Sequence, residues 1–243
     1  MTDLATMLWK EFAEFLGNRR SLRVFAIAVG IFGLLPTLGA ARHIPPPLRD
    51  VVLPMYVLVA CAIVVAQTAP DLVLRERTGH SLEYLLASRL SDGAIFGGKV
   101  ITAAVMGCVA ALLTVALQIV SLNLHGGGGT VGAATAGGIQ WLYLASPQGR
   151  LLAFLGPVLL AAYLATVGTF VALRVGDQRA AYMVTMLSVG VLVLPFVLKL
   201  ITPHVTLGWM EGAALVFAVL DLILVGLGIG LFRRERLVLY LQD

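Results

Sequence analysis

The chain contains little charge, little cysteine and no cluster of the residue types that catalysis or metal binding requires. Only 12% of its 243 residues are charged and 59% are apolar, whereas roughly 25% of residues are charged in soluble domains. Cys61 and Cys108 are the two cysteines, and both lie inside apolar runs without C-x-x-C spacing. These features exclude a water-soluble domain, a disulfide framework and a cysteine-based zinc site.

Residues suited to catalysis are scattered. The 13 acidic residues stand singly, and the four histidines show no metal-ligand spacing such as H-E-x-x-H. A glycine run follows His125, but no G-x-S-x-G nucleophile elbow accompanies it. Gly93–Lys99 fits a phosphate-binding loop, except that Val100 replaces the Ser or Thr that binds magnesium. We therefore predict no catalytic residue, no metal ligand, no cofactor and no ATP site on this chain.

Long apolar runs dominate the sequence instead. A helix needs about 20 residues to cross a membrane, and six runs are long enough. They are 24–41, 52–70, 98–121, 151–173, 180–200 and 211–232. We expect an all-α integral membrane protein in which residues 1–243 form one transmembrane domain with six spans.

The basic residues lie between these runs. Thirteen of the 17 lysines and arginines fall on the side that holds both termini, and four fall on the other side. Because cytoplasmic segments carry the excess of positive charge, both termini are expected in the cytoplasm. We predict a multi-pass protein of the cell inner (plasma) membrane. The net charge of +4 follows from this topology, so no nucleic-acid partner is expected.

Residues 1–20 predict an amphipathic helix that lies in the membrane interface. Lys10, Glu11 and Glu14 lie away from the apolar side of the helical wheel, and Gly17-Asn18 ends the helix. A short solvated helix that only anchors the chain is the alternative. The apolar positions are Leu4, Leu8, Phe12, Phe15 and Leu16.

Few polar residues lie inside the spans, and Asp221 is the clearest. It lies ten residues into the last run, roughly 15 Å from its start and near the middle of a bilayer. A carboxyl group is costly at that depth, so Asp221 either lines a translocation route or subunit seam, or is a structural group bonded to a neighbouring helix. Gln67 and Gln118 are further candidates for the route or seam, although interhelical hydrogen bonds also account for them.

The cytoplasmic loop 71–97, between spans 2 and 3, is the most informative stretch. Its charged start leads into a short amphipathic helix with Leu82, Leu85 and Leu86 on one face, and Ser91 or Asp92 then caps the next span. Leucines on so short a cytoplasmic helix need a partner surface. That surface is the membrane interface or another protein.

The pattern R-E-x-x-x-x-S-L-E-x-L-L-A-S-x-L-S-x-x-x-I-x-x-G-K, from Arg75 to Lys99, resembles this loop in ABC transporter permeases of the ABC-2 export family. The chain departs from the family at His80, where glycine is usual, and at Arg89, where proline is common. The resemblance implies a coupling helix that docks on a separate ATP-binding subunit. The implied docking residues are Arg75, Glu76, Leu82, Glu83, Leu85 and Leu86.

The resemblance further implies two permease chains, identical or different, paired with two ATP-binding subunits that hold ATP and magnesium. The chain itself would be no enzyme, and it would move its substrate out of the cytoplasm by alternating access. Aliphatic and small side chains in the spans favour an amphipathic, lipid-like or drug-like substrate. The alternatives are the haem-exporter membrane subunit of cytochrome c maturation, an ATP-independent channel or scaffold, and a membrane enzyme.

Overall fold

The computed structural model describes residues 3–35, 46–79, 91–125, 147–201, 215–216 and 218–227. Over these residues the chain forms helices and no strand, which confirms the prediction of an all-α protein. The helices are α1 (Asp3–Gly17), α2 (Arg19–Leu34), α3 (Pro46–Thr78), α5 (Asp92–His125), α6 (Pro147–Arg174) and α7 (Gln178–Ile201), followed by a short apolar helix, Ala218–Leu227.

Three segments within these helices are long and apolar enough to cross a membrane. Val52–Arg77 and Gly149–Arg174 have 26 residues each, and Gly93–Leu122 has 30. At 1.5 Å per residue, even the shorter two extend for about 39 Å, which exceeds the roughly 30 Å of bilayer hydrocarbon. The three segments indicate a membrane protein, and each contains the whole of one predicted span: 52–70, 98–121 and 151–173.

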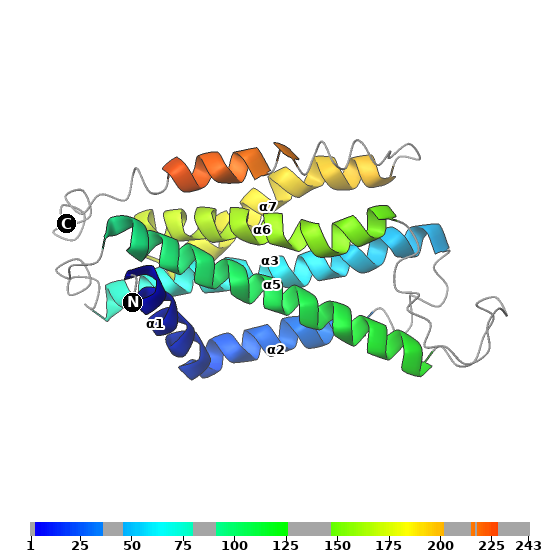
Figure 1. Ribbon diagram of the computed structural model, residues 1–243, viewed down its shortest axis with the longest axis horizontal. Helices are drawn as coiled ribbons and strands as arrows, with labels where there is room; N and C mark the ends of the chain where they lie inside the picture. The colour runs from blue at the N-terminus through cyan, green and yellow to red at the C-terminus, as the bar shows by residue number, and fades with distance from the viewer. Residues whose placement is uncertain are drawn as a thin grey trace.

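Successive long helices run in opposite directions along one bundle (Figure 1). The start of α2, the end of α3, the start of α5, the end of α6 and the start of α7 therefore lie together, on the left in Figure 1. We call this end the base of the bundle. Helix α1 lies at the base and crosses the direction of the longer helices, and Asn18 separates it from α2. The helix end predicted at Gly17-Asn18 is thus present.

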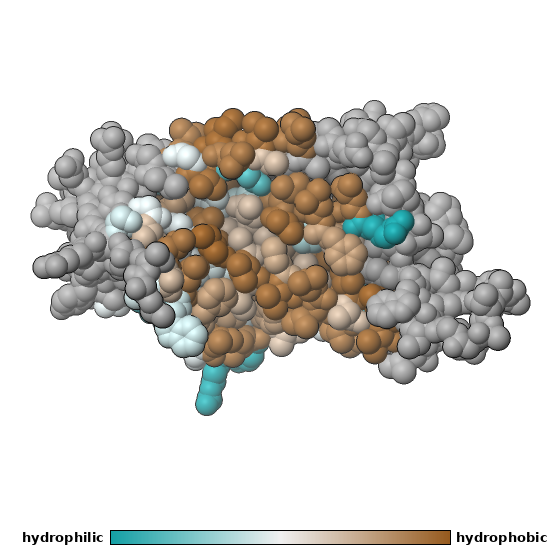
Figure 2. All heavy atoms as spheres, viewed as in Figure 1, coloured by the Kyte–Doolittle hydropathy of each residue, from teal (hydrophilic) through white to brown (hydrophobic). Residues whose placement is uncertain are grey.

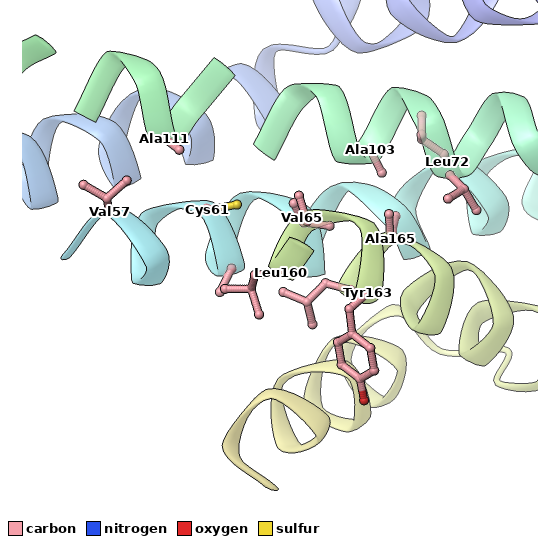
Figure 3. Packing of buried hydrophobic residues seen from close by; sticks show 14 of the residues in the cluster. Val57, Cys61, Val65, Leu72, Ala103, Ala111, Leu160, Tyr163 and Ala165 are labelled. Atoms are coloured by element: carbon pink, nitrogen blue, oxygen red, sulfur yellow. The ribbon is translucent and has the colours of Figure 1, made fainter. Parts of the chain in front are cut away.

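Helix α3 lies at the centre and packs against α5 and α6 through small and aliphatic side chains (Figure 3). Val57, Cys61 and Val65 recur every four residues on one side of α3 and are completely buried. A side chain at Gly107 of α5 would place its Cβ 2.2 Å from Val65 Cγ2. Small residues of this kind allow membrane helices to approach closely.

Four threonine hydroxyls inside the bundle are satisfied within their own helices. The hydroxyls of Thr68, Thr114, Thr169 and Thr185 each donate to the carbonyl four residues earlier, at 2.7–2.8 Å. The outer surface is apolar around the middle of the bundle, as the brown band in Figure 2 shows. Exposed aliphatic residues on several helices contribute to the apolar surface, among them Ile27, Leu112, Val158, Leu187 and Leu222. This surface is what a helix bundle presents to lipid.

The helices on either side of the predicted loop 71–97 extend into it. Helix α3 continues to Thr78, and α5 begins at Asp92. The backbone N–H of Ala94 donates to Ser91 Oγ at 3.3 Å, so Ser91 rather than Asp92 caps α5. Asp71 and Glu76 lie within the helical part of α3 because their side chains pair with residues of neighbouring helices.

Candidate functional site at the base of the bundle

Lys99 forms the centre of a buried ionic cluster. Its side chain is 1% exposed, and its ammonium donates to Glu11 Oε1 at 2.9 Å and to the carbonyl of Leu72 at 3.0 Å. It also forms an ion pair with Glu76 Oε2 at 2.6 Å. These contacts join α1, α3 and α5 at the base. A charge this deeply buried is stable only when it is paired in this way.

Lys10 completes this cluster from the solvent side. Its ammonium is hydrogen-bonded to Glu76 Oε1 and lies 3.4 Å from Glu14 and 3.9 Å from Glu11. Burial raises the pKa of the Glu11 carboxyl above its ordinary value, although the charge of Lys99 opposes this shift. Burial lowers the pKa of Lys10, but the hydrogen bond and the charge of Glu76 outweigh it, and the pKa is raised overall.

Three carboxylates in this cluster lie close enough to hold a metal ion. Ligand oxygens of Glu11, Glu14 and Glu76 all lie within 4.8 Å of one another. However, the ammonium of Lys10 contacts the same three carboxylates and supplies positive charge there. We therefore interpret the group as an ion-pair cluster that links helices.

A glycine allows α1 to approach α5 closely enough for this pairing. A Cβ at Gly98 would lie 2.6 Å from Met7 Cγ and 3.1 Å from Met7 Cβ. Met7, Glu11 and Phe15 recur every four residues and form the buried side of α1. The same side that packs against the bundle therefore carries the carboxylate that reaches Lys99, which is adjacent to Gly98.

A second polar cluster surrounds Asp71, one turn earlier on α3. Arg75 pairs with Asp71 across one helical turn. Ser21 Oγ of α2 donates to Asp71 Oδ2 at 3.1 Å, and Gln178 Nε2 of α7 donates to Asp71 Oδ1 at 3.0 Å. Asn18, the N-cap of α2, donates to Ser21 Oγ at 2.6 Å. This cluster links the end of α3 to the starts of α2 and α7.

The two clusters together fix both ends of segment 79–91. Glu76 lies three residues before this segment, and Lys99 lies at the end of the second turn of α5 after it. Glu76 pairs with Lys10 and with Lys99, and Lys99 also pairs with Glu11. Breaking one partner of a buried ion pair typically costs about 3–5 kcal/mol. A displacement of segment 79–91 would therefore be transmitted to α1 through these pairs.

The predicted coupling residues divide into two groups. Arg75 and Glu76 are described, and Glu76 is buried within the cluster rather than exposed at the surface. Leu82, Glu83, Leu85 and Leu86 lie outside the described residues.

The three polar candidates inside the spans have different surroundings. Asp221 is 7% exposed on the short helix Ala218–Leu227, and neither of its carboxylate oxygens has a hydrogen-bond partner within the described part of the chain. Gln118 is buried and donates to the carbonyl of Phe32 on α2 at 3.0 Å. Gln67 is half-buried on α3. Gln118 thus joins two helices, whereas Asp221 is the buried carboxyl without a described partner.

Sequence reasoning missed the pairing of Glu11, Asp71 and Lys99 with other helices. In the sequence, Lys99 contributes only to the basic charge expected in the cytoplasm, and Glu11 lies away from the apolar side of the helical wheel. One signal was available: Glu11 lies four residues from both Met7 and Phe15, so it shares their side of the helix.

No protein-family model matches the chain, and no curated protein matches its sequence.

Proposed function

We propose that the chain is the transmembrane permease subunit of an ATP-driven ABC exporter of the ABC-2 type. The observation that carries this proposal is the buried pairing of Glu76 and Lys99 at the two ends of segment 79–91. Such pairing suits a cytoplasmic segment that receives force from another protein and transmits it to helices. The Arg75–Lys99 sequence pattern supports the same function independently.

The proposed topology has six spans with both termini in the cytoplasm. Helices α2, α3, α5, α6 and α7 supply five spans, and residues 211–232 supply the sixth. The base of the bundle would face the cytoplasm. The positive-inside rule supports this orientation, because the structure describes five exposed arginines at the base and one, Arg150, at the opposite end. The exposed arginines at the base are Arg19, Arg20, Arg23, Arg174 and Arg179.

Segment 79–91 would form the coupling helix of this exporter. Leu82, Glu83, Leu85 and Leu86 would contact a groove of the ATP-binding subunit, whereas Glu76 would act inside the permease through Lys10 and Lys99. Arg75 would act in the same way through Asp71. Two permease chains would pair with two ATP-binding subunits, on which ATP and magnesium are held.

Alternating access would follow from movement of the two coupling helices. Because α1 and α5 share the Lys99 cluster and α2 and α7 share the Asp71 cluster, motion at the coupling helix would shift these helices together. Such a shift would reshape a cavity between two permease chains. The aliphatic spans favour an amphipathic, lipid-like or drug-like substrate that leaves the cytoplasm through this cavity.

The test is co-purification from the native host. The tagged chain, solubilised in detergent, should recover an ATP-binding subunit by mass spectrometry, and the eluate should hydrolyse ATP. Glu83→Lys should abolish this recovery, because it reverses a charge on the proposed docking face. Asp50→Lys is the matched control, since Asp50 is the fifth residue of α3, at the opposite end of the bundle, and its replacement should leave recovery unchanged.

The other outcomes distinguish the alternatives. A clean homo-oligomer without ATPase activity would contradict the exporter and favour an ATP-independent channel, with Asp221 as the next residue to test. Recovery of haem with the complex would favour the haem-exporter subunit. Turnover of a lipid by the purified chain alone would favour a membrane enzyme.

A further inference from the structure

The exposed side of α2 changes from basic to apolar within one helical turn. Arg19, Arg20 and Arg23 are exposed at the base, and Ile27 and Ile31 are exposed on the same side at four-residue intervals from Arg23. Four residues of helix rise about 6 Å. A change this abrupt on a lipid-facing helix indicates the boundary between phospholipid headgroups and acyl chains.

Helix α1 lies at the same end of the bundle (Figure 1) and has an exposed apolar strip. Trp9 is 79% exposed and Leu16 is 61% exposed, and Ala13 lies between them on the same side of the helix. The rings of Phe15 and Phe25 pack edge to face with centroids 6.4 Å apart and fix the corner between α1 and α2. Because tryptophan is enriched at membrane interfaces, this strip fits the headgroup boundary.

The three exposed arginines at the start of α2, Arg19, Arg20 and Arg23, have no negatively charged partner among the residues that the structure describes. Arg23 Nε donates to the Arg19 carbonyl at 3.2 Å, and Arg20 donates to Gln178 Oε1 at 3.3 Å. Both acceptors are uncharged, so the three positive charges are not balanced by them.

The position of these arginines adds to the imbalance. They lie within the first five residues of α2, whose first turn contains no acidic residue. The N-terminus of a helix carries partial positive charge and disfavours further cations. Each guanidinium has five N–H donors, and each of these arginines uses no more than one of them in the contacts above. The corner therefore has both the charge and the donors to bind an anion.

We propose that the corner between α1 and α2 binds the phosphate headgroups of anionic phospholipids. Arg19, Arg20 and Arg23 contact the headgroups, while Trp9 and Leu16 insert between the acyl chains next to them. The exposed apolar side chains favour a lipid headgroup over free phosphate, because a lipid also covers these side chains and free phosphate does not. This inference needs the bundle to span a membrane and does not depend on an ATP-binding subunit.

The test uses Trp9 as the reporter in the full-length chain. Trp141→Phe and Trp209→Phe leave Trp9 as the one tryptophan. The protein is reconstituted in two sets of phosphatidylcholine vesicles. One set contains a minor fraction of brominated phosphatidylglycerol, and the other contains the same fraction of brominated phosphatidylcholine. The brominated acyl chains quench tryptophan fluorescence on contact. We expect the anionic lipid to be enriched around Trp9 by about fivefold for each arginine that contacts a headgroup.

Matched variants separate recognition from folding. Replacing all three arginines with glutamine should remove the preference for phosphatidylglycerol, whereas replacing all three with lysine should keep most of it. Arg150→Gln changes the exposed arginine at the opposite end of the bundle and should leave the preference intact.

Three results would overturn the proposal. Equal quenching by the two brominated lipids would show that the arginines do not select anionic headgroups. Absence of quenching by either lipid would show that Trp9 does not reach the bilayer. Loss of the preference on adding inorganic phosphate at constant ionic strength would assign the site to free phosphate. None of these readouts involves ATP hydrolysis, so failure here is distinct from failure of the exporter proposal.

Discussion

Lys99 and Glu11 form a buried ion pair, with 2.9 Å between the ammonium and a carboxylate oxygen, although 88 residues separate them in the sequence. Both side chains are almost completely inaccessible to solvent. The pair places a short N-terminal helix against the start of a long apolar helix at the point where the chain emerges from segment 79–91.

Removal of Lys99 should destabilise the bundle strongly. Lys99→Met leaves the carboxylates of Glu11 and Glu76 buried without their shared cation, which typically costs about 3–5 kcal/mol. Unfolding by sodium dodecyl sulfate in mixed micelles measures the loss. Lys10→Met should cost only about 1 kcal/mol, because Lys10 is partly exposed and its ion pairs are weakened by solvent. Equal losses for the two variants would contradict the central position of Lys99.

Neutralising both partners should recover part of this loss. Glu11→Gln combined with Lys99→Met removes one buried charge of each sign, so the double variant should be more stable than the sum of the two single losses predicts. The double-mutant cycle measures the coupling energy directly. A coupling energy smaller than about 0.5 kcal/mol would show that the two side chains do not interact.

A side chain at position 98 should displace α1. Gly98→Val places a Cβ against Met7, where the nearest atom lies at 2.6 Å, and overpacking of this kind typically costs about 1–3 kcal/mol. Limited proteolysis within residues 3–17 should therefore become faster. Gly30→Val is the matched control on α2, since nothing lies within 4 Å of a Cβ there. Equal protection in the two variants would contradict the close approach of α1 to α5.

The raised pKa of Glu11 predicts an unusual pH dependence. Because the pKa in the folded protein lies above the ordinary value of 4.5, the folded state binds the proton more tightly than the unfolded state. The contribution of the Glu11 carboxyl to the free energy of unfolding is therefore fully present below pH 4.5. This contribution is lost as the pH rises through the raised pKa of Glu11. The free energy of unfolding of the parent protein, relative to Glu11→Gln, should fall as the pH rises above 4.5. A rise over this range would show that pairing with Lys99 outweighs burial.

Neutralising Asp221 should leave the fold intact. Its carboxylate oxygens have no hydrogen-bond partner among the described residues, so Asp221→Asn removes an ionisable group without breaking a described contact. We expect an unchanged or higher unfolding midpoint together with reduced export, measured as cellular efflux of a panel of fluorescent amphipathic dyes. A lowered midpoint with normal efflux would instead identify Asp221 as a structural group.

The sequence predicted the three long apolar segments and the break at Gly17-Asn18 because apolar runs and helix ends are local properties. It placed the start of the loop at 71, whereas α3 continues to Thr78. The difference arises because Asp71 and Glu76 have partners on other helices, and a window along the chain does not contain those partners.

The ionic cluster was harder to predict than the spans. Glu11 and Glu14 look equivalent in the sequence, yet Glu11 is completely buried and Glu14 is exposed. The distinction depends on which side of α1 meets α5, and Gly98 helps to determine this by allowing Met7 to approach closely. Tertiary contact of this kind appears in the sequence only as a small residue next to a lysine.

The separation between Glu11 and Lys99 also constrains how the protein is made. Ribosomes add about 5–20 residues per second, so Lys99 is synthesised roughly 4–18 s after Glu11, which precedes it by 88 positions. During that interval the N-terminal helix has no cation from α5 to pair with. It can take its final position only after the start of α5 has been synthesised, which makes docking of α1 a late step of folding although its residues are synthesised earlier.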